Sequence, residues 1–239
     1  MAAFLSLLLT KMSLVLAAND QPRTEIQSFP LHVEQNGVDG TLRLLVDSRL
    51  TESVRTQLLG NGDWSFVLQP STELYKEFSA IPPCPAKLEV LDERGRLIAE
   101  RLLETPLARI EKWSPNQIPG WGFLLTQDFS IGMGSYNGPL TTVLRILKAR
   151  FIEISSINHD TQKPEPIRLA KTLRAGWRIT HYDGATEILA ISCHPDNSQN
   201  FVIDYARYRF DGTLWVKLTR QAPGMWESDQ PFPLRSAFP

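Results

Sequence analysis

Runs of branched and aromatic residues alternate with turn residues through the second half of the chain. Clear examples are residues 122–130, 186–192 and 200–210. Such runs are typical of β-strands, because branched and aromatic side chains pack well on a pleated surface. The pattern predicts a mainly β protein, either a β-sandwich or a partly open barrel, with a few short helices. An α+β fold is the alternative.

The last of these runs continues into a hairpin, for which we predict a three-residue loop at 210–212. This loop places Tyr208 opposite Leu214 on a buried side of the sheet. It places Arg207 opposite Trp215 on the solvated side, where a cation–π contact is worth about 0.5–1 kcal/mol. A slip of one residue would exchange the two sides, so the burial pattern selects the loop length.

The first half of the chain predicts two further hairpins. One turns in the Gly- and Asp-containing stretch 36–40, between two strand-like runs. The other has a tight loop that ends at Gly95, where a positive φ is needed. The pairs expected across this second hairpin are Leu91 with Leu97 and Val90 with Ile98.

Helices are predicted within residues 50–62, 71–80 and 165–180. In the third segment, apolar residues recur every four positions and basic residues lie on roughly the opposite side. The apolar residues are Leu169, Leu173 and Trp177, and the basic ones are Arg168, Lys171 and Arg174. A basic helix face can bind an anionic partner. The favoured interpretation is an ordinary solvated face above a buried stripe.

A stretch rich in proline, residues 105–120, divides the chain. It predicts a linker between an N-terminal β-rich domain with short helices, residues 19–104, and a C-terminal β domain, residues 121–239. A single domain over residues 19–239 is the alternative. Residues 1–18 form an apolar run interrupted by Lys11 and followed by small residues, which predicts a signal peptide.

Export places the mature protein in the periplasm or outside the cell. The apolar run is too short to predict a transmembrane anchor, which needs roughly 20 uninterrupted apolar residues. The chain contains two cysteines, Cys84 and Cys193, which form a candidate disulfide in an oxidising compartment. Lys and Arg number 25 and Asp and Glu number 26, so the balanced charge argues against a nucleic-acid partner.

The glycine-rich stretch 128–139 is the first candidate site. It does not predict a dinucleotide or phosphate loop, because a strand-like run rather than a helix follows it. The favoured interpretation is a β-to-β corner with a tight Asn137–Gly138 turn. Its polar side chains are the candidate ligand-binding residues: Asp128, Ser135, Tyr136 and Asn137.

A second candidate site is the cluster of Cys193, His194 and Asp196. Neighbouring residues of a strand point to opposite faces, so the cysteine and the histidine are poorly placed to act together. None of the four histidines has metal-ligand spacing to another, so we predict no metal site. P-loop, zinc-binding and nucleophile-elbow motifs are absent from the sequence, and no cofactor is predicted.

These observations favour an exported, non-enzymatic protein that binds an unidentified protein, glycan or small ligand. The alternative is an exported hydrolase with a dispersed serine, histidine and acid site that uses Ser135 or His194. The proline-rich C-terminal stretch 222–239 predicts an irregular strap that is anchored by Trp226 and Phe232.

Overall fold

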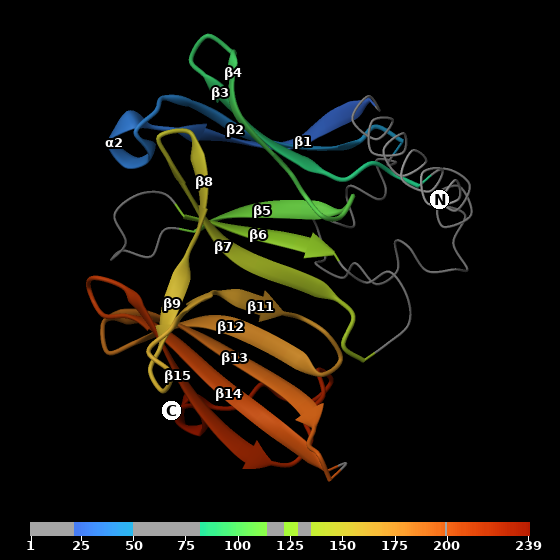
Figure 1. Ribbon diagram of the computed structural model, residues 1–239, viewed down its shortest axis with the longest axis vertical. Helices are drawn as coiled ribbons and strands as arrows, with labels where there is room; N and C mark the ends of the chain where they lie inside the picture. The colour runs from blue at the N-terminus through green and yellow to red at the C-terminus, as the bar shows by residue number, and fades with distance from the viewer. Residues whose placement is uncertain (1–21, 50–81, 114–121, 129–134, 199) are drawn as a thin grey trace, which may run out of the picture. The chain divides into compact units, whose positions relative to one another are not determined.

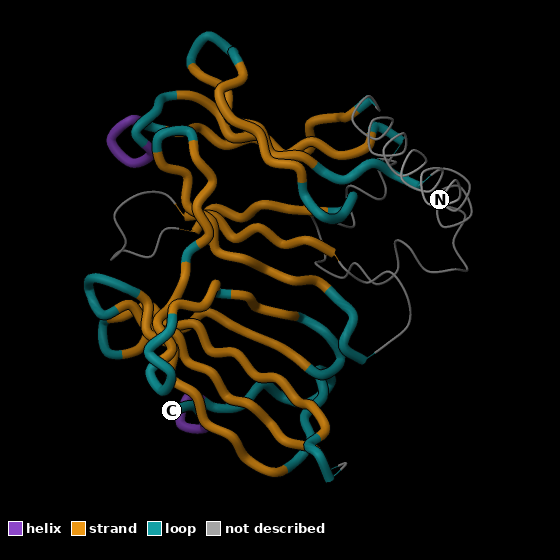
Figure 2. The backbone as a smooth tube through the Cα atoms, viewed as in Figure 1, coloured by secondary structure: helices purple, strands orange, loops and turns teal. Residues whose placement is uncertain are grey.

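The computed structural model describes residues 22–49, 82–113, 122–128, 135–198 and 200–239. The predicted signal peptide and the predicted helices within 50–62 and 71–80 lie outside these residues. The described chain is mainly β, with several antiparallel sheets and a β-sandwich-like fold, as the pattern of hydrophobic residues predicts (Figures 1 and 2). It divides into two compact units, residues 1–30 with 40–109 and residues 31–39 with 110–239.

The first unit contains a four-stranded sheet. Its strands, in their order across the sheet, are β1 (Arg23–Leu31), β2 (Gly40–Asp47), β3 (Lys87–Asp92) and β4 (Leu97–Leu102). Leu42 and Leu44 of β2 lie opposite Val90 and Leu88 of β3, and all four side chains are buried. This alternation of buried and more exposed positions is the period of two that a half-buried strand requires.

The hairpin between β3 and β4 confirms part of the prediction. Leu91 pairs with Leu97, and Gly95 has the expected positive φ of 73°. Val90, however, pairs with Ala99 rather than Ile98, because the register shifts between positions 90 and 91. An irregularity of this kind adds one residue to one strand and moves every later pair by one.

The second unit contains two sheets that share a core. The six-stranded sheet has the order β10 (Pro164–Pro166), β9 (Ser155–Asn158), β15 (Trp215–Pro223), β14 (Phe201–Phe210), β13 (Ala185–Pro195) and β12 (Ala175–Tyr182). The other sheet has the order β11 (Arg168–Ala170), β7 (Pro139–Leu147), β6 (Gly122–Asp128) and β5 (Ala108–Trp113), and β8 (Arg150–Glu153) pairs with β7. Strand β5 therefore lies within the segment predicted as a linker.

One hydrophobic cluster joins these two sheets. Its buried members are Trp113, Leu124, Val143, Ile167, Leu169, Ile188, Tyr208, Phe210 and Trp215. Each sheet contributes one face, which is the arrangement of a β-sandwich. Figure 1 shows β12 to β15 as one layer and β5 to β7 as another. We call the face of the six-stranded sheet that carries Ile188 and Tyr208 its inner face.

The predicted helix over 165–180 is wrong, because this segment forms β10, β11 and β12. Ile167 and Leu169 are buried on either side of exposed Arg168, which is the period of a strand. Trp177 also packs against the shared core, but from β12. The spacing of eight residues between Leu169 and Trp177, which equals two steps of four, therefore reflects two strands rather than one helix.

The loop length predicted for the last hairpin is also wrong. Phe210 pairs with Trp215, so the loop has four residues, and Arg207 pairs with Leu218. The carboxylate of Asp211 accepts hydrogen bonds from the backbone N–H groups of Thr213 and Leu214, at 2.8 and 2.9 Å. These two bonds stabilise the wider loop. Trp215 is buried in the core, so the predicted cation–π contact with Arg207 is not formed.

The C-terminal strap packs on the outer face of the six-stranded sheet, as predicted. Trp226 is buried against Ile191, Cys193 and Ile203, and Phe232 packs against the same cluster. A short 3-10 helix, η1 (Arg235–Ala237), follows near the end of the chain. The strap thus supplies the apolar cover that this face of the sheet needs.

The predicted disulfide is not present, because both cysteines are free thiols in the structure. Cys84 is buried in the first unit, where its backbone N–H donates to Asp47. Cys193 is buried in the second unit beside Trp226, and its thiol donates to the carbonyl of Gly224 at 3.8 Å. Each cysteine therefore serves as a small apolar residue in its own cluster.

Candidate functional site

A pocket of about 720 Å³ opens on the inner face of the six-stranded sheet, and all of its lining residues belong to the second unit. The lining residues are Asp160, Arg168, Ala170, Ala175, Gly176, Ala190, Ile191, Ser192, Asp204, Ala206, Tyr208, Lys217, Thr219, Arg220 and Gln221. The pocket therefore begins where the shared hydrophobic core ends.

Small side chains create this space. Ala190 of β13 and Ala206 of β14 are direct cross-strand partners. Each lies two residues from a core residue of its own strand, Ile188 or Tyr208, and therefore points to the same inner face. In the neighbouring cross-strand pair, the larger side chains of Ile188 and Tyr208 fill the space above the sheet. The methyl groups of Ala190 and Ala206 leave the corresponding space open.

A polar row follows the alanines across the same face. Ser192, Asp204 and Gln221 are successive cross-strand neighbours on β13, β14 and β15. The amide of Gln221 donates to Oδ1 of Asp204 at 2.8 Å. The ring Nδ1 of His194 lies 3.0 Å from Oδ2 of the same carboxylate. Both oxygens of Asp204 thus have one partner each.

The opposite end of the pocket contains a lysine and a tyrosine, Lys217 and Tyr208, which are cross-strand partners. The Lys217 ammonium donates to Glu165 at 2.8 Å, and Asn158 donates to the other oxygen of that carboxylate at 3.1 Å. Burial lowers the pKa of Lys217, but the hydrogen bond to Glu165 together with the charges of the neighbouring acidic groups outweighs burial, and the pKa is raised. Burial raises the pKa of Tyr208.

Asp160 enters the pocket from the turn after β9. Its backbone N–H donates to the side-chain oxygen of Asn158 at 2.9 Å, which fixes the turn. The hydroxyl of Thr219 donates to Oδ2 of Asp160 at 2.8 Å. The hydrogen bond from Thr219 is the main cause of a lowered pKa for Asp160, so this group is a carboxylate at neutral pH.

Two arginines complete the lining, and their guanidinium groups lie in different places relative to the pocket. The guanidinium of Arg220 stacks over the ring of Tyr205, 5.0 Å from its centroid. Tyr205 and Arg220 are cross-strand partners on the outer face, so this charge points away from the pocket. Arg168 is exposed on β11 at the pocket's edge.

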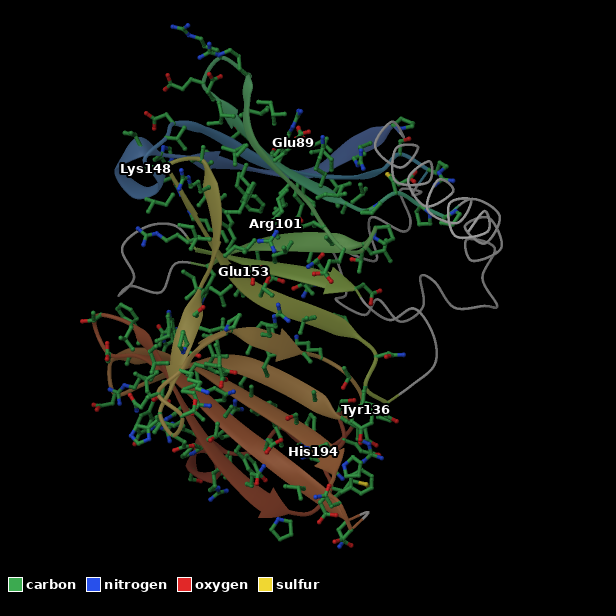
Figure 3. All side chains as sticks on the ribbon, viewed as in Figure 1. Glu89, Arg101, Tyr136, Lys148, Glu153 and His194 are labelled. Atoms are coloured by element: carbon green, nitrogen blue, oxygen red, sulfur yellow. The ribbon has the colours of Figure 1, made fainter. Side chains whose placement is uncertain are left out.

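The four predicted ligand-binding residues lie elsewhere. Asp128 is buried at the end of β6, opposite Pro139, and the carbonyl of Ser135 accepts a bond from the backbone of Arg174 at 3.2 Å. Tyr136 lies shortly before β7 (Figure 3), and 56% of its surface is exposed. None of these three, nor Asn137, is among the described residues that line the pocket. Their role in binding stays a prediction.

The corner that these residues form is a β-to-β connection, as predicted, since β6 and β7 pair as antiparallel strands. The tight turn at Asn137 and Gly138 is wrong, because neither residue has a positive φ. Glycine is required at 138 for another reason. A Cβ there would lie 2.2 Å from the backbone carbonyl oxygen of Lys171.

The second predicted cluster is divided by the strand. Cys193 is buried on the outer face, whereas His194 pairs with Asp204 beside the pocket (Figure 3). Asp196 caps the turn between β13 and β14 by accepting the backbone N–H groups of Ser198 and Asn200. In the described part of the chain, no three acids, histidines or cysteines form a group that could hold a metal ion.

Sequence reasoning missed most of the pocket. The signal was present as polar or small residues at alternate positions, on the same face as the core residue of the same strand. On β14 these positions are Asp204, Ala206 and Tyr208, and on β15 they are Lys217, Thr219 and Gln221. The cross-strand register was needed to bring them together.

Comparison with known proteins adds no family to this description. No protein-family model, curated protein or solved structure matches the chain. Among the described residues, no helix combines the length and hydrophobicity that are needed to span a bilayer. The function is therefore inferred from the pocket and its side chains.

Proposed function

We propose that the chain is an exported, non-enzymatic protein whose second unit binds a small polar ligand in the pocket beside Ala190 and Ala206. The pocket carries this proposal. Its volume of about 720 Å³ lies within the range of roughly 300–1,000 Å³ that is typical of small-molecule sites. Its lining combines an apolar floor with hydrogen-bonding groups that converge from several strands, which can fix the orientation of a ligand.

A variant that fills the pocket tests this proposal. Ala206→Leu places a larger side chain between the two sheets, and Ala99→Leu, at a half-buried position of β4 in the first unit, is the control. A small-molecule screen by thermal unfolding should find ligands that raise the Tm of the wild type and of the control but not of the pocket variant. Ligands that stabilise all three proteins equally would refute binding at this pocket.

Export is supported by the apolar N-terminal run, residues 1–18. Cell fractionation followed by N-terminal sequencing should find mature protein that starts after this run in the periplasm or the medium. Deletion of residues 1–18 should leave the protein in the cytoplasm. Full-length, uncleaved protein in the cytoplasm would contradict export.

A second candidate function is hydrolysis, and the ion pair between His194 and Asp204 favours it. A carboxylate that holds the Nδ1 of a histidine orients its Nε2 for use as a general base. Ser192 is the serine placed directly opposite Asp204. Among the described residues, the side-chain partner of His194 is Asp204 rather than a serine hydroxyl. Ester turnover that is lost in both Ser192→Ala and His194→Ala would favour hydrolysis over binding alone.

A further inference from the structure

We infer that the pocket ligand is a short neutral saccharide. The inference rests on the proposed function, because it assumes that the pocket binds a ligand, and it goes further by assigning a chemical class. Three properties of the pocket carry it: the balance of its charges, the excess of hydrogen-bond acceptors over free donors, and the apolar floor.

Most of the charged groups in the pocket have a partner. The Lys217 ammonium is paired with the Glu165 carboxylate, and the Asp204 carboxylate accepts a hydrogen bond from Gln221 and contacts the ring Nδ1 of His194. Arg220 directs its charge toward Tyr205 on the outer face. Asp160 and Arg168 remain, and they have opposite signs. A charged ligand therefore gains little net attraction, and it must be desolvated in order to bind.

The acceptors in the pocket set the requirement for donors on the ligand. The hydroxyl hydrogen of Thr219 is used by Asp160, so the Thr219 oxygen offers only lone pairs. The four carboxylate oxygens of Asp160 and Asp204 each have one protein partner, and each carboxylate oxygen can accept a second hydrogen bond. A ligand that covers these oxygens without donating to them leaves them desolvated, which is costly.

The donors in the pocket are fewer and require acceptors on the ligand. Gln221 has a second amide hydrogen besides the one that it donates to Asp204. Lys217 has three hydrogens, one of which points to Glu165. The hydroxyl of Ser192 can donate or accept. An alcohol group does both, so a ligand with several hydroxyl groups satisfies donors and acceptors at the same site.

The floor adds the last constraint. Ala175, Ala190 and Ala206 of the six-stranded sheet line the pocket with methyl groups, and Ala170 of β11 adds a fourth. A pyranose ring has C–H groups on its faces and hydroxyl groups around its rim, so it can contact the methyl groups and the polar row together. An aliphatic polyamine would meet Lys217 and Arg168, and a sugar acid would meet Asp160 and Asp204.

Titration calorimetry on the full mature chain tests the class of ligand. The neutral probes are glucose, galactose, mannose, N-acetylglucosamine, maltose, lactose and chitobiose, and the charged probes are glucuronate, glucosamine and spermidine. At least one neutral probe should bind with a Kd of about 1 mM or below. Each charged probe should bind at least about tenfold more weakly than the best neutral one.

Two conservative variants test the contacts. Asp204→Asn and Thr219→Val should each weaken binding of the best neutral probe by about tenfold or more, because each removes an acceptor that the ligand satisfies. Thr161→Val, on the exposed turn beside Asp160, is the matched control and should bind like the wild type. If all three variants bound the best neutral probe with the affinity of the wild type, the saccharide inference would be overturned.

The outcomes separate this inference from the proposed function. A charged probe that binds as tightly as any neutral one, and is lost in Ala206→Leu, overturns the saccharide class but supports the pocket as a binding site. The absence of binding by any neutral probe at roughly 10 mM also overturns the class, and the wider small-molecule screen then decides the proposed function. Saccharide binding that survives in Ala206→Leu overturns both.

Discussion

The attachment of the C-terminal strap to the sheet depends on a buried ion pair. The side chain of Glu187 is fully buried on the outer face of β13, and Arg235 of the strap donates to both of its oxygens at 2.8 and 3.3 Å. Arg235 also stacks over Tyr182, 4.6 Å from the ring centroid. Arg207 is the other cation beside Glu187, at 3.6 Å. Arg235→Ala should therefore leave a buried carboxylate with weaker compensation.

The size of the effect follows from the burial. Removal of one partner from a buried ion pair costs about 3–5 kcal/mol. Arg235 is partly exposed and Arg207 remains, so we expect the lower end of this range, about 3 kcal/mol, with the loss of the stacking on Tyr182 included. For a chain of this length such a loss lowers the Tm by roughly 6–12 °C.

Thermal and urea unfolding of Arg235→Ala measure this loss. Arg96→Ala is the matched control, because Arg96 forms an exposed ion pair with Asp92 and should change the Tm little. The double variant Glu187→Gln with Arg235→Ala should be less destabilised than the sum of the two single variants, since the buried group that lacks Arg235 is then a neutral amide rather than a carboxylate. Equal Tm values for Arg235→Ala and Arg96→Ala would refute the reasoning.

Four further predictions concern the rest of the chain. Ala149→Gly should stabilise the folded protein by about 0.5 kcal/mol. Ala149 has a φ of 57°, and the cost of this left-handed conformation for alanine exceeds the entropic penalty of glycine. A lower urea midpoint in the variant would contradict this. Gly138→Ala should cost about 1–3 kcal/mol, since its Cβ would meet a backbone carbonyl, and an unchanged Tm would contradict the close approach. Burial raises the pKa of Asp47, but hydrogen bonds from neighbouring N–H groups have a larger opposite effect, so the pKa falls from 3.8 to about 2. About 2 kcal/mol of folding stability should therefore be present above pH 4 and lost as the pH falls toward 2. Urea unfolding of Asp47→Asn should lack this pH dependence. Cys84 and Cys193 should resist alkylation in the native protein and both react in denaturant, whereas a two-hydrogen mass loss without reductant would show a disulfide.

The alternation of apolar residues was sufficient to predict the fold class, because branched and aromatic runs favour strands whatever their partners. It was insufficient for register. At the last hairpin the side chain of Asp211 bonds two backbone N–H groups and widens the loop, an effect that composition does not reveal. At 165–180, Leu169 and Trp177 have helical spacing by coincidence, because they belong to two strands that pack on one core.

The candidate site was harder to predict, for a related physical reason. A motif search finds residues that are close in sequence, and it selected the glycine-rich stretch before Pro139 and the cluster at His194. The pocket instead combines Ala190, Ala206 and Thr219, which become neighbours only through the pairing of three strands. Of the candidate site residues named from the sequence, His194 contacts the pocket's lining, through Asp204.

The same pairing supports the proposal that the pocket is a binding site. Ile188 and Tyr208 fill the inner face in one row, and the cross-strand pair Ala190 and Ala206 leaves the next row open. Burial of one additional CH₂ is worth about 0.8 kcal/mol, so a leucine at either alanine would bury three more carbons and could gain about 2 kcal/mol. A sandwich selected only for stability would extend its core through this row. Two methyl groups beside the polar row of Ser192, Asp204 and Gln221 instead fit the proposed binding site.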